Sequence, residues 1–466
     1  VLNEHRQGGI LTDGYYENPF TDGTERIITD RFSGGIGYHK SFMRAGEIHF
    51  DVSYTNHKRN ATNDTFLGDY MATHEDSLPS VLDMRPYIAE EDLYVATFSY
   101  VHRLGADHRL LAGVQYSHNM LNESGKYVVV DDADPLYGES YTSYSEKEAD
   151  DFGVFVQDEY TITRDLELAG GVRFDTHRSR DEFRGSGNVN PVGLEAVEYD
   201  ESAVNPRFAI KYSATEALTL RGSFGTGFRV PYGFSEELHL CSGSPRVWKP
   251  ANLKPEKSMS YGVAADYSTS NLGLSLNLYR TDLQNKIDFA EASNQPGYDY
   301  QWENIDDAFV MGAEIGAQYA ITGDLVIAAD FAFNVGEYKN ERNDWAGTPY
   351  YADSKKISRY PSTAGGAKIE FSPRDWLFVF NGGYTGIMYI DYFMNNEDPT
   401  LIHATDPYVI LNCQISRTLF DNYKVYAGAH NLGDCVQNLK YDDDAAFMFA
   451  PVYGRIIYGG VEVTLQ

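Results

Sequence analysis

The feature that most constrains the fold of this chain is the alternation of short and long joints between extended segments. The short joints, such as 43–46 and 104–107, hold only a few turn-forming residues. The long joints, such as 59–91 and 119–150, are polar stretches of roughly 15 to 40 residues. A strand that crosses a wall, turns tightly and returns to a long loop is typical of an outer-membrane β-barrel, which has short periplasmic turns and long external loops.

The extended segments alternate between apolar and polar residues. Residues 272–279 read LGLSLNLY, 166–175 read LELAGGVRFD and 409–416 read VILNCQIS. A period of two places the two sets of side chains on opposite faces of a strand. A soluble sandwich alternates in the same way, but its strands average about 5 to 6 residues, whereas several here run about 10 to 14. This length favours a transmembrane antiparallel β-barrel, because a tilted strand needs about 9 to 11 residues to cross the membrane.

Composition agrees with an all-β membrane protein. No apolar run approaches the length of a transmembrane helix, and 36 Tyr and 25 Phe suit the aromatic girdles of a barrel. The net charge of −30 disfavours nucleic acid as a partner. Of the three cysteines, Cys413 falls in the same alternating set as the side chains of its segment that we expect to face lipid. Cys241 and Cys435 fall in proposed external loops, and whether they form a disulfide stays open.

The alternation predicts about 17 strands in one continuous domain over residues 1–466. Bacterial single-chain barrels normally have an even number of strands, and no signal peptide precedes the first strand. We therefore expect the chain to be the C-terminal portion of a longer barrel protein. The predicted strands are 29–40, 46–58, 92–103, 108–118, 151–162, 166–179, 203–212, 218–227, 257–267, 272–283, 308–321, 325–339, 362–371, 377–390, 408–417, 424–431 and 455–465.

Four short motifs occur in order along the chain from residue 221 onward. Residues 221–238 read RGSFGTGFRVPYGFSEEL, and 252–258 read NLKPEKS. Asn304 precedes the sequence GAE at 312–314, and 431–434 read NLGD. In this order they resemble the FRAP-like, NPxLxPE, GxE and NLxD boxes of TonB-dependent outer-membrane receptors, with valine replacing the usual alanine of the first box. The residues that carry the first two boxes are Phe228, Arg229, Pro231, Glu237, Leu238, Asn252, Leu253, Pro255 and Glu256.

The resemblance implies a barrel of about 22 strands, so about five strands would be missing here. It also implies an N-terminal plug with a TonB box, absent from these residues, through which an inner-membrane TonB complex would drive transport. Members of the family import ferric siderophores, haem, cobalamin or oligosaccharides. We predict uptake of a metal chelate such as a ferric siderophore and no enzymatic activity. Haem, cobalamin or oligosaccharide import, and a surface adhesin or partner-binding barrel, are the alternatives. A surface lipoprotein that covers the external loops is a further alternative partner.

The boxes also have a structural interpretation. Pro231 ends a strand ladder because it has no amide donor. Arg229 and Glu256 flank a long loop, and we expect them to pair near its mouth. We therefore favour a role in fixing the loop over direct contact with a ligand.

The candidate ligand-binding residues lie in the proposed loops. By resemblance to haem receptors, a histidine between the first two boxes would ligate haem iron, and His239 holds that place. Three further loop histidines carry less support. Clustered carboxylates can hold Ca²⁺, which is the one cofactor considered, although solvated acidic loops have the same composition. The other binding candidates are Arg246, Trp248, Tyr389 and Tyr392, the further histidines are His74, His118 and His403, and the acidic clusters are Asp131, Asp132, Asp134, Asp442, Asp443 and Asp444.

Overall fold

The structure of the chain is a computed structural model. It describes residues 2–9, 24–42, 46–63, 87–128, 135, 138, 140–187, 196–231, 247–248, 250–291, 300–342, 346, 351–358, 360–389, 404–420, 422–436, 450–451 and 454–464.

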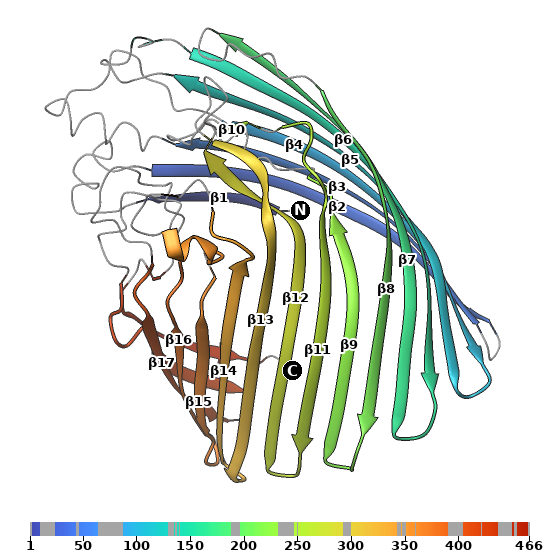
Figure 1. Cartoon of the computed structure of the whole chain (residues 1–466). Helices are drawn as coiled ribbons and strands as arrows, with labels where there is room; N and C mark the ends of the chain where they lie inside the picture. The colour runs from blue at the N-terminus through green and yellow to red at the C-terminus, as the bar shows by residue number, and fades with distance from the viewer. Residues whose placement is uncertain are drawn as a thin grey trace, which may run out of the picture.

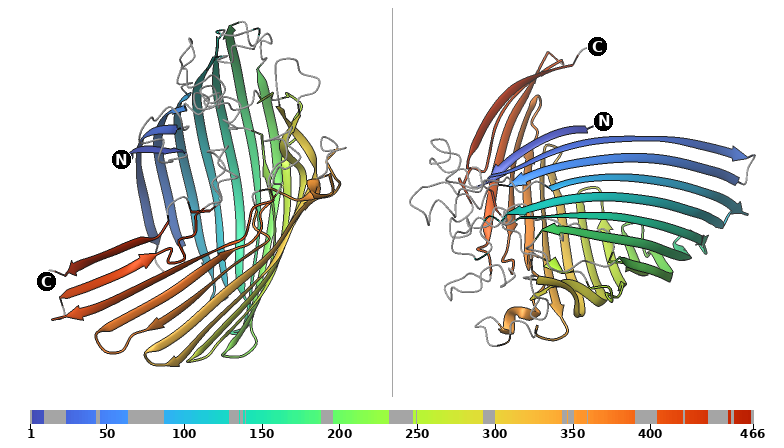
Figure 2. Two further views of the ribbon diagram at one scale, coloured as in Figure 1. Left: turned by 90° about the vertical axis from the view of Figure 1, so that its left-hand side faces the viewer. Right: turned by 90° about the horizontal axis from the view of Figure 1, so that it is seen from above.

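The described residues form one 19-stranded sheet and a short 3-10 helix. Figure 1 and the two views of Figure 2 show this sheet curving around a central space as a barrel wall. Short turns join the strands at one end of the wall, and the strand ends that adjoin the long connections lie at the other end. The elements are β1 (Leu2–Gly9), β2 (Thr24–Phe42), β3 (Gly46–Asn63), β4 (Tyr87–Leu104), β5 (His108–Val128), β6 (Ser140–Thr161), β7 (Leu166–Gly187), β8 (Val197–Ser213), β9 (Leu218–Arg229), β10 (Val247–Trp248), β11 (Glu256–Ser268), β12 (Leu272–Glu291), β13 (Tyr300–Thr322), β14 (Leu325–Tyr338), η3 (Tyr351–Lys355), β15 (Thr363–Phe371), β16 (Trp376–Thr385), β17 (Tyr408–Leu419), β18 (Tyr423–His430) and β19 (Ile456–Val463).

Neighbouring strands are antiparallel throughout the wall. β1 pairs with β2, the registers then run in chain order to β9, and β9 pairs with β11. From β11 the antiparallel order continues to β19. The exception is β10, which pairs in parallel with β13 through Val247 and Trp248. The chain is therefore an up-and-down meander, as the alternating joints predict.

The seventeen predicted strands are confirmed as β2–β9 and β11–β19, and β1 and β10 are additional. Several strands are longer than expected. β6 and β7 have 22 residues each, and β13 has 23. Residues 119–128 and 140–150, which we expected in a loop, continue β5 and β6 as a paired hairpin. These extensions are mostly polar, so they lack the alternation that marks the rest of each strand.

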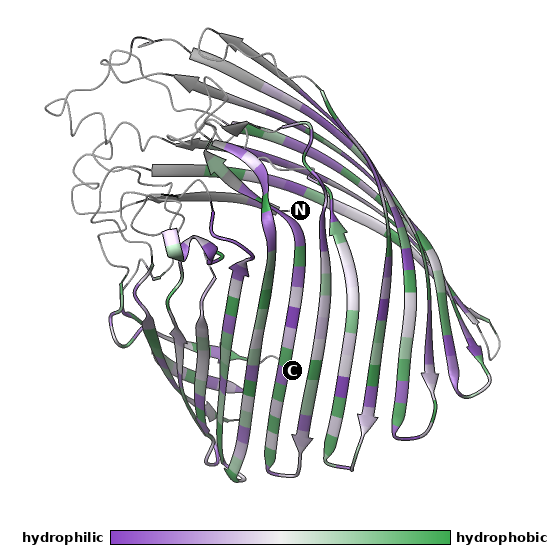
Figure 3. Ribbon diagram, in the orientation of Figure 1, coloured by the Kyte–Doolittle hydropathy of each residue, from purple (hydrophilic) through white to green (hydrophobic). Residues whose placement is uncertain are grey.

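The two faces of the wall differ in polarity. Side chains at even positions of β3 to β7 point outward and are mostly apolar along the middle of these strands, where Phe50, Val114 and Phe174 are 46%, 38% and 43% exposed. The intervening side chains, such as Gln115 and Arg173, point inward and bond to one another. Figure 3 shows the resulting alternation of hydrophobic and hydrophilic residues along the strands. The wall is thus apolar outside and polar inside, as in a membrane barrel.

The described part of the chain contains no helix that is both long enough and apolar enough to cross a membrane.

Buried apolar residues gather near the loop end of the wall rather than in one central core. Val197, Tyr199 and Val230 form one small cluster, against which Phe228 packs. Ala61 and Tyr87 form another between β3 and β4. Both clusters therefore lie at strand ends that adjoin long connections.

Cys413 and Cys435 are free thiols within the described residues. Cys413 lies on β17, while Cys241, the proposed partner of Cys435, lies outside the described residues.

Candidate functional site

Two of the family boxes meet at the loop end of β9 and β11. Arg229, the last residue of β9, lies opposite Glu256, the first residue of β11. Their side chains form an ion pair, with 2.6 Å between Arg229 Nη2 and Glu256 Oε2. The other carboxylate oxygen of Glu256 accepts a hydrogen bond from the backbone N–H of Ile287 at 2.7 Å. The expected pairing at the loop mouth is confirmed, and it also anchors β12.

Asn304 ties the second box to β12 and β13. Its side-chain oxygen accepts the N–H of Lys254 at 2.8 Å, and its amide donates to the carbonyls of Lys254 and Asn285 at 3.0 and 2.8 Å. Asn285 in turn donates to the carbonyl of Pro255 at 3.3 Å. Asn285 has a φ of 54°, in the left-handed region that asparagine tolerates. The β12–β13 register shifts beside it, between Leu283 and Lys286, which brings these groups together.

Of the remaining described residues of the first two boxes, Pro231, Leu253 and Pro255 are apolar and buried, Phe228 is half-buried and Asn252 is exposed. Pro231 is fully buried, and Leu253 is nearly so. Phe228 packs against the buried cluster that contains Val230. These contacts support the structural interpretation of the boxes, since buried side chains cannot reach a ligand in the central space.

The NLGD box makes similar hydrogen bonds near the C-terminal end of the chain. The side chain of Asn431 accepts the N–H of Cys435 at 2.9 Å and donates to its carbonyl at 2.7 Å. Asp434 accepts the N–H of Arg455 at 2.7 Å, so the box holds both ends of the connection into β19. Asn431 and Asp434 both have positive φ, which Asn and Asp adopt more readily than other residues with a side chain.

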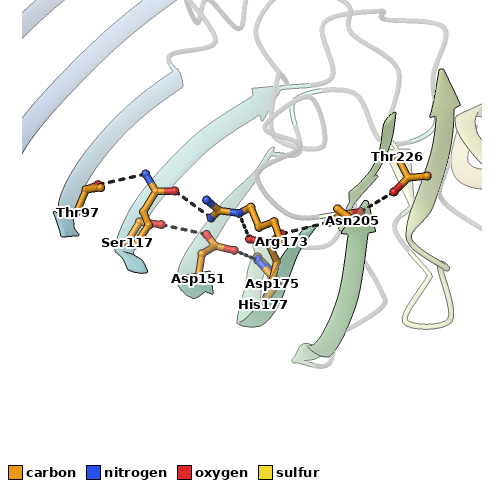
Figure 4. Close-up of polar contacts among 9 residues, drawn as sticks. Thr97, Ser117, Asp151, Arg173, Asp175, His177, Asn205 and Thr226 are labelled. Carbon is orange, nitrogen blue, oxygen red and sulfur yellow. Dashed lines mark hydrogen bonds and ion pairs between the residues drawn. The ribbon is translucent and has the colours of Figure 1, made fainter. Parts of the chain in front are cut away.

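The inward face carries the polar network that we identify as the candidate site. A hydrogen-bonded chain links side chains of β4, β5, β7, β8 and β9 (Figure 4). Gln115 donates to Thr97 at 3.4 Å and accepts from Arg173 Nη2 at 3.0 Å. The guanidinium of Arg173 also donates to Asp175, whose other oxygen accepts from Asn205 at 3.1 Å. The chain ends with a 3.5 Å contact from Thr226 to Asn205.

A second group of polar contacts runs beside the first. Ser117 donates to Asp151 at 3.3 Å, and the other oxygen of Asp151 lies 2.7 Å from Nδ1 of His177. The Arg173 guanidinium also lies 5.6 Å from the ring centroid of Phe155, a cation–π distance. Donors and acceptors of both charge signs therefore face the central space, which suits a polar ligand or polar protein surface.

The inward face stays charged toward the short turns. Arg109 and Glu159 form a 3.0 Å ion pair, and so do Lys211 and Glu167. These four residues line one inward hollow. The polar lining therefore extends over the height of this side of the wall.

A segment after η3 lies against the inward face of β14. Tyr279 donates to Asn334 at 2.6 Å, and the hydroxyl of Tyr360 lies 3.3 Å from that of Tyr279. Burial, together with this hydrogen bond, raises the pKa of Tyr360 well above its ordinary value. Asn334 donates to the carbonyl of Pro361 at 3.1 Å, so the segment is held to the wall by polar contacts.

Of the five predicted ligand-binding residues, the structure describes the side chain of Tyr389 alone. Its ring centroid lies 5.9 Å from the ammonium of Lys356, which pairs with Glu337. The hydrogen bond with Glu337 raises the pKa of Lys356, so the ammonium stays charged beside the ring. The backbone of Trp248 pairs with Gln301. The predicted residues that lie outside the described residues are His239, Arg246, Tyr392, Glu237, Leu238, His74, His403, Asp131, Asp132, Asp134, Asp442, Asp443 and Asp444.

His118 requires a correction. We group it with the loop histidines, at the end of the predicted strand 108–118, but it lies within β5, which continues to Val128. The inward network was also missed, because Gln115 and Arg173 are separated by 58 residues and meet only when the strand registers are known. The alternation did place Arg173 on the polar face of its strand.

Comparison with known proteins identifies the family. Residues 2–432 match the family model described as TonB dependent receptor-like, beta-barrel. The chain is 25% identical over 295 residues to the vitamin B12 transporter BtuB of Photobacterium profundum, and 24% identical over 301 residues to an iron-regulated outer membrane virulence protein of Vibrio cholerae. These matches cover 63% and 62% of this chain but 41% of each relative, so the chain spans about two-fifths of their length.

Solved structures show the same fold. The FrpB iron transporter of Neisseria meningitidis superimposes with a TM-score of 0.68 at 14% identity, covering 99% of this chain and 68% of that one. The copper transporter OprC gives a TM-score of 0.67 at 16% identity, covering 95% and 68%. With the matched family model, the meander of antiparallel strands and the loop-closing boxes, these findings show that the chain belongs to the TonB-dependent receptor β-barrel family.

Proposed function

We propose that this chain is the barrel wall of an outer-membrane receptor that takes up a metal chelate, such as a ferric siderophore, at the expense of TonB-transmitted energy. The observation that carries the proposal is the family match over residues 2–432. The two faces of the wall support it. An apolar outward face suits lipid, and a continuous polar lining suits the passage of a hydrophilic ligand.

The choice of a metal chelate rests on the names of similar proteins. One relative is an iron-regulated outer membrane protein. Proteins of similar fold include the ferric yersiniabactin uptake receptor FyuA, with a TM-score of 0.65, and the ferric citrate transporter FecA, with a TM-score of 0.66. The inward network adds a chemical argument, because ferric chelates are polar and often charged, and Arg173 and His177 lie among its donors.

Cobalamin is the second candidate ligand, and one observation favours it. The relative that is 25% identical over 295 residues is a vitamin B12 transporter. Cobalamin is itself a cobalt chelate with many amide groups, so a lining of amides, hydroxyls and carboxylates suits it as well. Ca²⁺ bound by external acidic clusters stays a proposal that this second function would bring with it.

The proposed partners follow from the family. A plug domain with a TonB box would fill the central space and contact an inner-membrane TonB complex. Force on the plug would release the ligand inward. The inward network would then face the plug as well as the ligand, which suits its mixture of donors and acceptors.

The test is ligand binding by the full-length protein in outer-membrane vesicles. The panel consists of ferric catecholates, ferric hydroxamates, haem, cobalamin with and without Ca²⁺, and oligosaccharides, and vesicles without the protein are the control. We expect saturable binding of a ferric chelate, and uptake that is lost in cells lacking TonB while binding remains. Binding of cobalamin alone would support the second candidate, and binding of haem or oligosaccharides alone would contradict both.

A further inference from the structure

Two cross-strand rows of side chains on the outward face of β3 to β7 differ in polarity. Phe50, Phe98, Val114, Val154 and Phe174 lie side by side in one row. This row is entirely apolar and belongs to the lipid-facing band.

The corresponding row nearer the loop end consists of Tyr54, Tyr94, His118, Asp150 and Arg178. Tyrosines mark the upper edge of the apolar band here, as expected of an interfacial girdle. An imidazole and a carboxylate lie beside them on the same outward face. The two rows therefore place a polar cluster just above the apolar band and away from the central space.

His118, Asp150 and Glu148 bring three potential metal ligands together. Asp150 lies directly opposite His118 in the β5–β6 register, and Glu148 is the next residue on the same face of β6. His118 Nδ1 lies 3.0 Å from Asp150 Oδ1, and His118 Nε2 lies 3.8 Å from Glu148 Oε1. One ligand atom from each residue lies within 4.8 Å of the others, and this is the one such group in the part of the chain that the structure describes.

The surroundings hold two of these side chains in place. The His118 ring lies 6.3 Å from the ring of Tyr94, and its side chain is 22% exposed. Tyr116 donates a hydrogen bond to Oδ1 of Asp150, the same oxygen that His118 contacts, so neither contact uses Oδ2. Arg178 lies opposite Asp150, but its guanidinium donates to Asp200 at 3.1 Å. The guanidinium on the strand position opposite Asp150 is therefore paired with another carboxylate.

We propose that His118, Glu148 and Asp150 form a binding site for a divalent transition-metal ion of the Zn²⁺ type. One imidazole nitrogen and two carboxylate oxygens are a donor set that such ions favour, whereas Ca²⁺ and Mg²⁺ take oxygen ligands. Three protein ligands leave a fourth position open to water. The site is separate from the import path, because its side chains point outward. The proposal goes beyond the proposed function and does not depend on it.

The experiment measures Zn²⁺ binding to the full-length protein in detergent after chelator treatment, by calorimetry and metal analysis. Co²⁺ serves as a spectroscopic substitute, since its absorption reports coordination without any import assay. The variants are His118→Ala and Glu148→Gln. The matched control is His108→Ala, because His108 makes the same contact on the same two strands, with Nδ1 2.7 Å from Asp158 Oδ2, and belongs to no group of three ligands among the described residues.

We expect the unaltered protein and His108→Ala to bind one more Zn²⁺ ion per chain than His118→Ala, and Glu148→Gln to bind that ion more weakly. Excess Mg²⁺ should not displace it. Equal Zn²⁺ binding by the unaltered protein and His118→Ala would overturn the proposal. If His118→Ala does not fold, Glu148→Gln decides the outcome, because the Glu148 side chain is 62% exposed and its replacement leaves the strand contacts intact. Unchanged affinity in a folded Glu148→Gln protein would then refute the site.

Discussion

At the scale of single residues, Glu256 shows why a family box has the composition it has. The residue is 9% exposed, and its carboxylate serves two partners. One oxygen accepts the N–H of Ile287, which is buried, and the other pairs with the half-exposed guanidinium of Arg229. Burying an N–H without an acceptor is costly, whereas an exposed ion pair contributes little. The acceptor is thus the more important of the two roles.

Glu256→Ala should lower the free energy of unfolding by about 1–3 kcal/mol, because the Ile287 N–H loses its acceptor. Glu256→Gln keeps an oxygen for that N–H and loses only the charge, so its loss should be about 0–1 kcal/mol. Urea titration of the full-length protein, followed by tryptophan fluorescence, measures both values. Equal losses in the two variants would show that the ion pair, not the acceptor, holds the loop mouth.

The sequence predicts this pairing but not the contacts of Asn304. Arg229 and Glu256 flank one loop, so their proximity follows from the expected hairpin geometry. Asn304 bonds to Lys254, which is 50 residues away, and the contact depends on the register shift beside Asn285. A bulge of this kind has no signature in the alternation of residues, because it changes the pairing without changing the local pattern.

At the scale of elements, the extent of a strand can be predicted from the sequence where one of its two faces is apolar. It cannot be predicted where neither face is apolar. The loop-side part of β7, from Arg178 to Gly187, contains seven charged or serine residues and no apolar period. Its pairing with β6 nevertheless continues to Tyr141 and Gly187. β10 is two residues long and pairs in parallel with β13, so it offers no periodicity at all. Periodicity therefore locates the lipid-facing part of a strand and not its full length.

Close approach between strands gives a prediction for Gly113 on the inward face of β5. A Cβ atom there would lie 2.6 Å from the carbonyl oxygen of Phe98 and 2.5 Å from the ring of Phe155. Gly113→Ala should therefore lower the free energy of unfolding by about 1–3 kcal/mol through overpacking.

The matched control is Gly170→Ala on β7, where an added Cβ meets no atom within 4 Å. That variant should change the free energy of unfolding by no more than about 0.5 kcal/mol. Urea unfolding of the two full-length variants makes the comparison, and equal stability of both would contradict the close approach at β5.

At the scale of the whole molecule, the inward network couples strands that are not neighbours. Arg173 on β7 bonds to Gln115 on β5, across the intervening β6. Arg173→Met should remove this coupling while keeping much of the side-chain volume. We expect backbone amides near Gln115 and Asp175 to exchange about tenfold faster in hydrogen-exchange measurements, because a charge-assisted contact no longer resists local opening.

Arg178→Met is the control for that experiment, because Arg178 lies on the outward face of β7 with a 75% exposed side chain. Its exchange pattern should match that of the unaltered protein. If the backbone amides of Arg173→Met exchange at an unchanged or slower rate, the backbone hydrogen bonds between strands alone set the rigidity of this part of the wall.

The unbroken pairing of β3 to β7 restricts how the length of such a protein can change. Inserting one residue between Leu110 and Val114 would turn Val114 into the central space and present Gln115 to lipid, because the period of a strand is two. Every residue beyond the insertion would be inverted until the loop. We therefore expect single insertions and deletions to be confined to the long connections, with changes inside the wall arriving in pairs. The loop end is accordingly where the length of the chain is free to diversify.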